Sequence, residues 1–225
     1  MIKILTHKQN NKAHAYLVSN DEIKEAVLID VANEEEAILK YLKDNELTLT
    51  NILITHGHAT HIKGLDKVID ANPDVKVWIH SDDHELIHDS KKNLSNKTEP
   101  WTMEFRKNIK NFTKEKSLTM SGMHVKMKPN PGHSRGSCFY DFSDIKALFT
   151  GDYVYINNNE ICYGNHKMLQ PGTSYIKFRR TLFNMDVRYM AYKIYPGHFD
   201  TPITNERLDK LDKDWFKKTK QKRNR

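Results

Sequence analysis

The chain has 225 residues, of which 38% are hydrophobic and 29% are charged, and its formal net charge is +7. This composition is typical of a globular protein, and no window approaches the ~20 apolar residues that a membrane-spanning helix needs. The apolar run at the start of the chain is too short for a signal peptide. The two cysteines, Cys138 and Cys162, are too few for a disulfide framework, so we expect a protein of the reducing cytoplasm.

The first third of the chain predicts strands followed by helices. Short apolar runs separated by turn-forming asparagines indicate strands, whereas apolar residues at helical spacing behind three glutamates indicate a helix. The expected strands are residues 2–6, 13–19, 26–30, 50–55 and 75–79, and the expected helices are residues 33–42 and 62–69.

The rest of the chain is less uniform. Residues 90–116 are polar and rich in Asn and Lys, which indicates an insertion or a loop on the substrate side. Two groups of strands, each followed by helices, fit two packed sheets with helices outside. Nothing marks a domain boundary, so we expect one domain over residues 1–212 and a basic tail over residues 213–225. The strands expected in this part are residues 123–127, 138–142, 147–150 and 190–195, and the helices are residues 174–184 and 204–216.

Histidines and one aspartate follow several of the predicted strands, in the segments T-H-G-H-A-T-H, P-G-H-S, F-T-G-D and Y-P-G-H. Imidazole and carboxylate groups are ligands for zinc, iron or manganese, and strand ends on a rigid scaffold fix their geometry. The candidate metal ligands are therefore His56, His58, His61, His133, Asp152 and His198. We interpret the remaining histidines as solvated side chains: His7, His14, His80, His84, His88, His124 and His166.

The four motifs, in this order, resemble those of the metallo-β-lactamase superfamily, and within it the small glyoxalase-II-like (hydroxyacylglutathione hydrolase-like) hydrolases, up to about Glu206. The resemblance implies an α/β (α+β) fold, a four-layer αββα sandwich with metals at one edge between the sheets. The implied cofactor is Zn²⁺, as one or two ions, with Fe or Mn as alternatives. The implied roles place a first ion on His56, His58 and His133, and a second ion on His61 and His198 with Asp152 as the bridging ligand.

One position departs from the family motif T-H-x-H-x-D-H, because Thr60 stands where the family has an aspartate. In the family that aspartate ligates the second metal and orients the attacking hydroxide. A threonine hydroxyl is a poor ligand for a divalent cation and carries no charge near neutral pH. Three alternatives stay open: a weakened dinuclear site, a mononuclear site on the three histidines of the first ion with or without Asp152, and a fold that has lost the chemistry, which we favour least because every other ligand is present.

The resemblance implies a hydrolase of a small-molecule thioester or ester, in which the metal activates a water molecule. The candidate catalytic residues are Asp152 and Thr60, whose role in place of the aspartate is open. Cys138 lies in an apolar strand, where a structural thiol is more common than a nucleophile. The larger glyoxalase II enzymes use a helical C-terminal domain to bind glutathione, and this chain ends too soon for one, so glutathione recognition stays open. The candidate substrate contacts are Arg135, Tyr153, Tyr163 and Lys167, and Asp200 is a candidate partner behind His198.

Three other classes of function stay open. A mononuclear iron persulfide dioxygenase would use a subset of ligands that matches His56, His133 and Asp152. The net charge suggests a member of the superfamily that acts on nucleic acid, and Thr60 suggests a non-catalytic binding module with a degenerate site.

The basic tail accounts for almost all of the net charge. Residues 213–225 hold seven basic and one acidic side chain, a net +6, which leaves +1 for the other 212 residues. We interpret the tail as a solvated end, and we therefore expect a small-molecule partner and no nucleic acid. The oligomeric state stays open.

Overall fold

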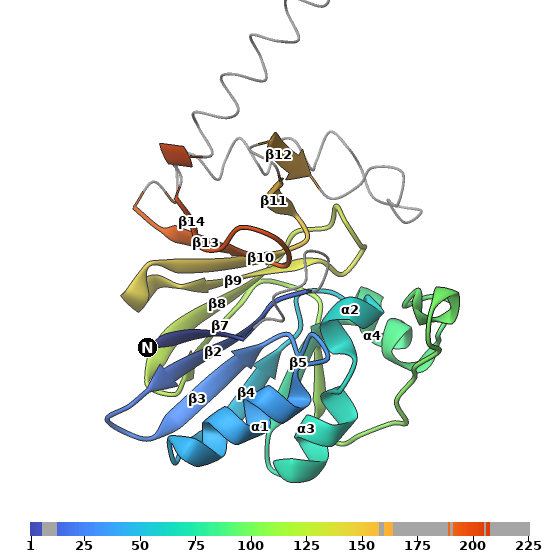
Figure 1. Cartoon of the computed structure of the whole chain (residues 1–225), viewed down its shortest axis with the longest axis horizontal. Helices are drawn as coiled ribbons and strands as arrows, with labels where there is room; N and C mark the ends of the chain where they lie inside the picture. The colour runs from blue at the N-terminus through green and yellow to red at the C-terminus, as the bar shows by residue number, and fades with distance from the viewer. Residues whose placement is uncertain (6–12, 158–159, 164–188, 190, 205, 208–225) are drawn as a thin grey trace, which may run out of the picture.

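The computed structural model describes residues 1–5, 13–157, 160–163, 189, 191–204 and 206–207, in which two six-stranded sheets lie face to face (Figure 1). In spatial order the first sheet contains β1 (Ile2–Leu5), β2 (Ala15–Asn20), β3 (Glu25–Ile29), β4 (Thr48–Leu53), β5 (Lys76–His80) and β6 (Ile109–Phe112). The second contains β14 (Ile203–Thr204), β13 (Lys193–Pro196), β10 (Ala147–Gly151), β9 (Cys138–Phe142), β8 (Met123–Pro129) and β7 (Lys116–Met120). A separate hairpin joins β11 (Val154–Asn157) to β12 (Glu160–Tyr163).

Helices cover the outer face of the first sheet. The α-helices are α1 (Glu35–Asp44), α2 (Ala59–Ile62), α3 (Leu65–Ala71) and α4 (Ser81–His84), and the 3₁₀ helices are η1 (Glu85–His88), η2 (Ser95–Lys97) and η3 (Ser143–Ile145). Strands β3 to β6 run parallel; α1 lies in the crossover from β3 to β4, α2 and α3 lie in the crossover from β4 to β5, and α4, η1 and η2 lie in the crossover from β5 to β6. The carboxyl ends of β3, β4 and β5 therefore lie at one edge of the sheet.

The second sheet brings two more strand ends to the same region. Strands β7 to β10 form an antiparallel meander, and β13 runs parallel to β10. The segments that follow β10 and β13 consequently leave the sheet side by side, which the hydrogen bond from Gly197 N to Gly151 O (2.8 Å) also shows.

Successive side chains along each strand point to opposite faces of its sheet, so each sheet contributes to two separate core layers. In β9, Tyr140 and Phe142 point between the two sheets and pack with Phe149 of β10, whereas Phe139 and Leu148 point to the outer face of the second sheet. The outer face of the first sheet packs against apolar residues of α1 and α3. A buried layer on each side of both sheets makes the scaffold rigid at the edge where the strand ends meet.

The predicted α/β sandwich is confirmed, and so are most of its predicted strands and its first helix. The segment 90–116, predicted to be irregular, contains β6 and the start of β7; both expose polar side chains at sheet edges, which hides them from hydrophobic patterning. Strands β11, β12 and β14 were also not predicted, and Thr204 lies in β14 and not at the start of a helix. The helix predicted at 174–184 and the tail lie outside the described residues, and the single domain over 1–212 stays a prediction.

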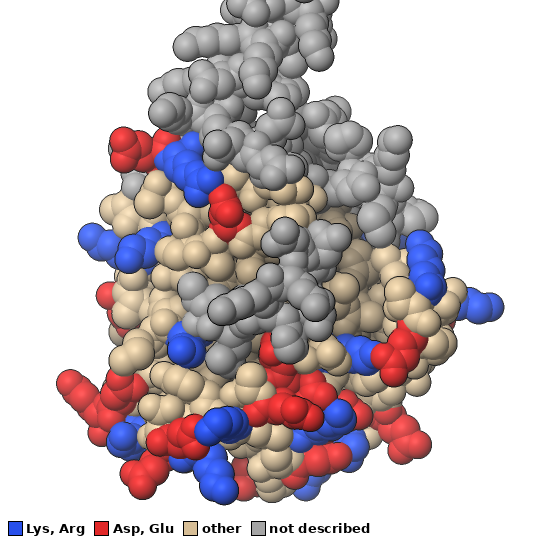
Figure 2. Space-filling model, viewed as in Figure 1, with Lys and Arg blue, Asp and Glu red and all other residues tan. Residues whose placement is uncertain are grey.

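The described surface has a mixed charge. Figure 2 shows basic and acidic side chains interspersed on one face of the molecule, most densely around the helices of the first sheet. Among the described residues, no helix combines the length and the apolar character that crossing a membrane requires.

Candidate metal centre

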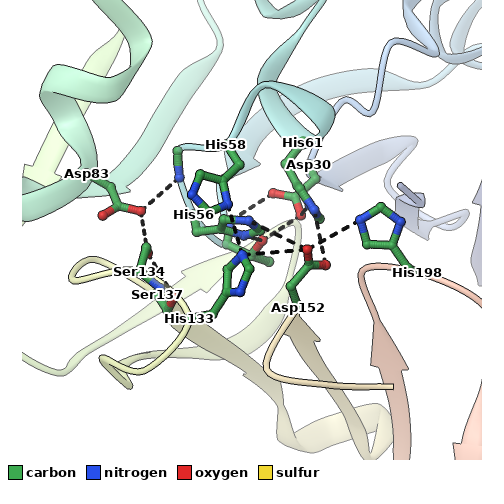
Figure 3. A network of polar contacts seen from close by, with 12 residues as sticks. Asp30, His56, His58, His61, Asp83, His133, Ser134, Ser137, Asp152 and His198 are labelled. Atoms are coloured by element: carbon green, nitrogen blue, oxygen red, sulfur yellow. Dashed lines mark hydrogen bonds and ion pairs between the residues drawn. The ribbon is translucent and has the colours of Figure 1, made fainter. Parts of the chain in front are cut away.

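Five histidines and one aspartate converge at the edge between the two sheets (Figure 3). His56 and His58 follow β4, and His61 lies in α2. His133 comes from the loop between β8 and β9, Asp152 follows β10, and His198 follows β13. All six predicted ligands are thus brought together, although they come from segments up to 142 residues apart in the sequence.

The first group consists of His56, His58 and His133, which are 1%, 6% and 6% exposed and whose ligand atoms lie within 4.8 Å of one another. Nδ1 of His58 lies 2.9 Å from Nε2 of His133. Burial, assisted by the neighbouring histidines, lowers the pKa of His56 well below its usual range and the pKa of His58 to about 3. These imidazoles are therefore neutral at pH 7, the form that binds a metal.

The second group is arranged around Asp152. One carboxylate oxygen lies 3.2 Å from Nε2 of His61, and the other lies 3.3 Å from Nε2 of His198. The second oxygen also faces the first group, at 3.7 Å from Nε2 of His133 and 3.9 Å from Nε2 of His56. Asp152 therefore lies near both groups, as the bridging role implied by the resemblance requires, and the ligand atom of His56 likewise lies within 4.8 Å of those of His61 and Asp152.

The charges of the second group are complementary. Burial opposes the charged form of His61, but the carboxylates of Asp152 and Asp30 outweigh burial and raise the pKa of His61 to about 10. Burial likewise opposes the charged form of Asp152, but His61 and His198 hold its pKa well below the usual range. Without a metal, His61 and Asp152 therefore form an ion pair, whereas the histidines of the first group are uncharged.

The donor atoms fit a metal ion. Nε2 of His56 is buried without a hydrogen-bond partner among the described residues, and Nε2 of His61 and Oδ1 of Asp152 are buried and face only each other, as an ion pair that is not aligned as a hydrogen bond. Two ligands about 2.1 Å from one tetrahedral ion lie roughly 3.4 Å apart, close to the separations around Asp152. The mixed nitrogen and oxygen set suits zinc, iron or manganese.

Asp30, at the end of β3, supports two of these ligands and was not predicted as a site residue. Its carboxylate accepts hydrogen bonds from the Thr55 N–H (2.8 Å) and hydroxyl (2.7 Å), and lies 2.8 Å from Nδ1 of His61. The Thr55 hydroxyl lies 3.1 Å from Nδ1 of His56. These contacts keep a proton on Nδ1 of both histidines, so the Nε2 lone pair of neutral His56 faces Asp152, and Nε2 of His61 offers a lone pair in the same direction once that ring loses its second proton.

Asp83, in α4, is the second supporting residue that the sequence did not reveal. It is fully buried, and its carboxylate contacts the loops that carry the first group (Figure 3). An S-D-D-H segment after a strand carries no pattern that distinguishes one of its aspartates.

Two glycines allow the loops to approach one another. Gly151 has a φ of +52°, and a Cβ there would lie 2.6 Å from the Thr55 hydroxyl. A Cβ on Gly197 would collide with the Asp152 carboxylate and with Cε1 of His61. The F-T-G-D and Y-P-G-H motifs therefore need glycine in front of the ligand for steric reasons.

The residues predicted around the ligands are placed more variably. Thr60 lies in α2 and is exposed, as is Arg135 in the loop after His133. Tyr153 is 1% exposed and packs edge-on against Phe139 in the core. The roles predicted for Thr60, Arg135 and Tyr153 stay predictions, and the same holds for the three residues described next. Asp200 is exposed and pairs with Arg207, Tyr163 ends β12 with its side chain outside the described residues, and Lys167 lies outside them.

Two of the histidines interpreted as solvated are buried, so that interpretation is wrong for them. His14 is 8% exposed, and its Nε2 lies 2.7 Å from the carbonyl oxygen of Phe199. Its backbone N–H also donates to the carbonyl of Gly197, so it fastens the loop of His198 to the start of β2. His80 is 6% exposed and packs edge-on against Phe112.

Comparison with known proteins gives a consistent result. The sequence profile of the Metallo-beta-lactamase superfamily matches residues 11–198. A probable metallo-hydrolase of Streptococcus pyogenes is 29% identical over 201 residues, which cover 82% of this chain and 78% of the relative. A hydroxyacylglutathione hydrolase of Roseobacter denitrificans is 30% identical over 67% of this chain, but the match spans only about half (51%) of that relative. The crystal structure of BLEG-1 B3 metallo-beta-lactamase superposes with a TM-score of 0.78 at 27% identity, covering 92% of this chain and 95% of that one.

Proposed function

Because this chain belongs to the metallo-beta-lactamase superfamily, we propose that it is a metal-dependent hydrolase that cleaves a small thioester or ester. The observation that carries the proposal is the Asp152 carboxylate, which faces histidine nitrogens of two groups at 3.2 to 3.9 Å. Relatives that are named as hydrolases support the reaction class.

The proposed ligands follow from the two groups. His56, His58 and His133 would hold one ion, while Asp152 would bridge it to a second ion on His61 and His198. When bound, such ions lower the pKa of a water molecule and polarise the carbonyl group of the substrate. We propose zinc, and iron and manganese suit the same donors.

The chain's own residues supply lone pairs and charge. Histidines with a lowered pKa offer their lone pairs at pH 7 without first losing a proton. Asp152 stays ionised and so contributes negative charge between the two groups. Cys138 is 1% exposed, and burial raises the pKa of its thiol well above the usual range, which disfavours it as a nucleophile and favours water.

The thioester is the finer part of the proposal. It rests on the resemblance to the hydroxyacylglutathione hydrolases, of which the chain matches about half. We therefore propose an acyl thioester without assigning glutathione as the leaving thiol. Arg135 is exposed beside the ligand loop and is the described candidate for contact with an anionic substrate group.

A metal-reconstitution assay tests this proposal. The apoprotein is loaded with zinc, manganese or iron, and hydrolysis is followed with S-lactoylglutathione, an acyl thioester without glutathione, and an aryl ester. We expect turnover only with metal, and its loss in His133→Ala, which removes one ligand of the first group. Metal-loaded protein that hydrolyses none of the three substrates would contradict the proposal, and turnover unchanged in His133→Ala would contradict the assigned site.

A mononuclear iron persulfide dioxygenase is the second candidate. It is favoured by Thr60, which is exposed and offers no carboxylate to a second ion. Oxygen consumption by the Fe²⁺-loaded protein with glutathione persulfide would support it, whereas hydrolysis without oxygen consumption supports the hydrolase.

A further inference from the structure

The Asp83 carboxylate lies to one side of the three-histidine group and connects the two loops that carry these histidines (Figure 3). One oxygen accepts hydrogen bonds from the Gly57 N–H (2.8 Å) and the Ser134 hydroxyl (2.6 Å). The other accepts from the Gly136 N–H (2.7 Å). The residue is 0% exposed, so all three hydrogen bonds are shielded from water.

The positions of these donors are informative. Gly57 is the residue between His56 and His58, and Ser134 directly follows His133. A single carboxylate therefore binds the backbone between His56 and His58 and the side chain of the residue that follows His133. The mechanism assigned to the metal makes no use of Asp83, which touches none of the ligand side chains through a described hydrogen bond.

The packing around Asp83 is tight on both sides. A Cβ on Gly136 would lie 2.6 Å from Cγ of Asp83, and a Cβ on Gly57 would lie 2.6 Å from Cβ of Leu86. Glycine is needed at both positions because the loops press against α4 and η1. A side chain at either glycine would therefore push its loop away from these helices.

A small network continues from Asp83 into the P-G-H-S turn. The Ser134 N–H donates to the Ser137 hydroxyl (2.8 Å), and the two hydroxyls lie 2.8 Å apart. The turn ends where the Cys138 N–H donates to the Thr55 carbonyl (2.8 Å), which joins the two sheets. The turn is thus fixed at both ends relative to β4.

We propose that Asp83 is a positioning residue that preorganises His56, His58 and His133, and so sets the affinity of the first metal ion. The inference rests on the proposed function in one respect, that the three histidines bind a metal. It differs from a purely structural role, because it requires metal affinity to change by more than folding stability explains.

Asp83→Asn separates these roles because it keeps the shape and changes only the acceptors. An amide offers one acceptor oxygen, and its NH₂ group would face either the Gly57 N–H or the Gly136 N–H. One of the two loops therefore loses its hydrogen bond in either orientation. Ser134→Ala removes one donor and leaves the carboxylate in place, so it is the milder variant.

The test is a Co²⁺ titration of the apoproteins, followed by the visible absorption of the bound ion, with thermal unfolding of each apoprotein measured in parallel. We expect Asp83→Asn to weaken the first equivalent by about 10- to 100-fold, the range seen when partners of metal ligands are removed, and to alter its absorption bands. Asp144→Asn is the matched control, because Asp144 accepts a backbone hydrogen bond from His124 (2.7 Å) on the second sheet. It should leave the first equivalent unchanged.

The outcomes are distinguishable. Wild-type affinity and absorption bands in Asp83→Asn would overturn the inference, even if the variant unfolds at a lower temperature. If that variant does not fold, Ser134→Ala decides: weaker Co²⁺ binding supports the inference, and unchanged binding overturns it. Wild-type protein that takes up no Co²⁺ would remove the proposed function and the inference together, whereas normal uptake with an unaffected Asp83→Asn removes the inference alone.

Discussion

We predict that the protonation of His61 makes binding of the proposed second metal ion depend on pH. The imidazole has a pKa raised to about 10, against 6.5 for a free histidine, because Asp152 and Asp30 outweigh its burial. A metal ion needs the neutral ring, so at pH 7 it must displace a proton. The difference of about three units between pH 7 and the pKa of His61 corresponds to about 4 kcal/mol, or a factor of about 1000 in the binding constant of the second ion.

The sign of the effect follows directly. Between pH 7 and about 10, the affinity of the second ion should rise about tenfold per pH unit. The ligands of the first ion are imidazoles with a lowered pKa, such as His58 at about 3, which are already neutral. The affinity of the first ion for these imidazoles should therefore not change between pH 7 and about 10. Without metal, the His61 ion pair contributes its full stability below pH 6.5 and loses it as the pH rises through about 10.

Isothermal titration calorimetry in buffers of different ionisation enthalpy measures the released protons. We expect the second equivalent to release one proton more from its ligands than the first at pH 7. Asp30→Asn removes one of the two carboxylates that raise the pKa of His61, and should reduce both that release and the pH dependence. Equal affinity of the second ion at pH 6.5 and 8.5 would show that His61 is neutral in the apoprotein and would refute the reasoning.

Three further substitutions have defined outcomes. Thr60→Asp restores a carboxylate beside the second group and should strengthen the second equivalent by more than about tenfold in a metal titration; no change would mean that this exposed position does not reach the ion. Gly197→Ala should weaken the second equivalent more than the first, because its Cβ would collide with the Asp152 carboxylate. Tyr140→Phe leaves the buried carbonyl of Ile54 without its hydrogen bond (2.5 Å), so thermal unfolding should show a loss of about 1–3 kcal/mol.

The convergence of the six candidate ligands could be predicted because each is marked by its neighbours in the sequence. His56 and His58 directly follow an apolar strand, and His133 lies in a Pro-Gly turn. A strand end fixes where a side chain emerges, so local patterns contain most of the information about such a ligand. The same strands predicted two packed sheets with helices outside, and the resemblance to the superfamily implied the four-layer αββα sandwich.

The residues that support the ligands could not be predicted in this way. Asp83 contacts Ser134 across 51 residues, and Asp30 contacts His61 across 31. Their partners are backbone N–H groups and ring nitrogens, which every sequence provides, so no local pattern marks them. The burial of His14 has the same origin, because the carbonyl that it contacts belongs to Phe199, 185 residues away.

The two groups of ligands differ in a way that bears on the choice between a mononuclear and a dinuclear site. The first group is neutral, and Asp83 holds its loops in place before any metal arrives. The second group is an ion pair whose proton must leave, and Thr60 gives it no additional carboxylate. Both differences favour filling of the first group, so we expect the protein to pass from a mononuclear to a dinuclear form as pH or metal concentration rises. The number of ions would then depend on the conditions as well as on the ligand set, and an assay at a single pH and metal concentration would sample only one of the two forms.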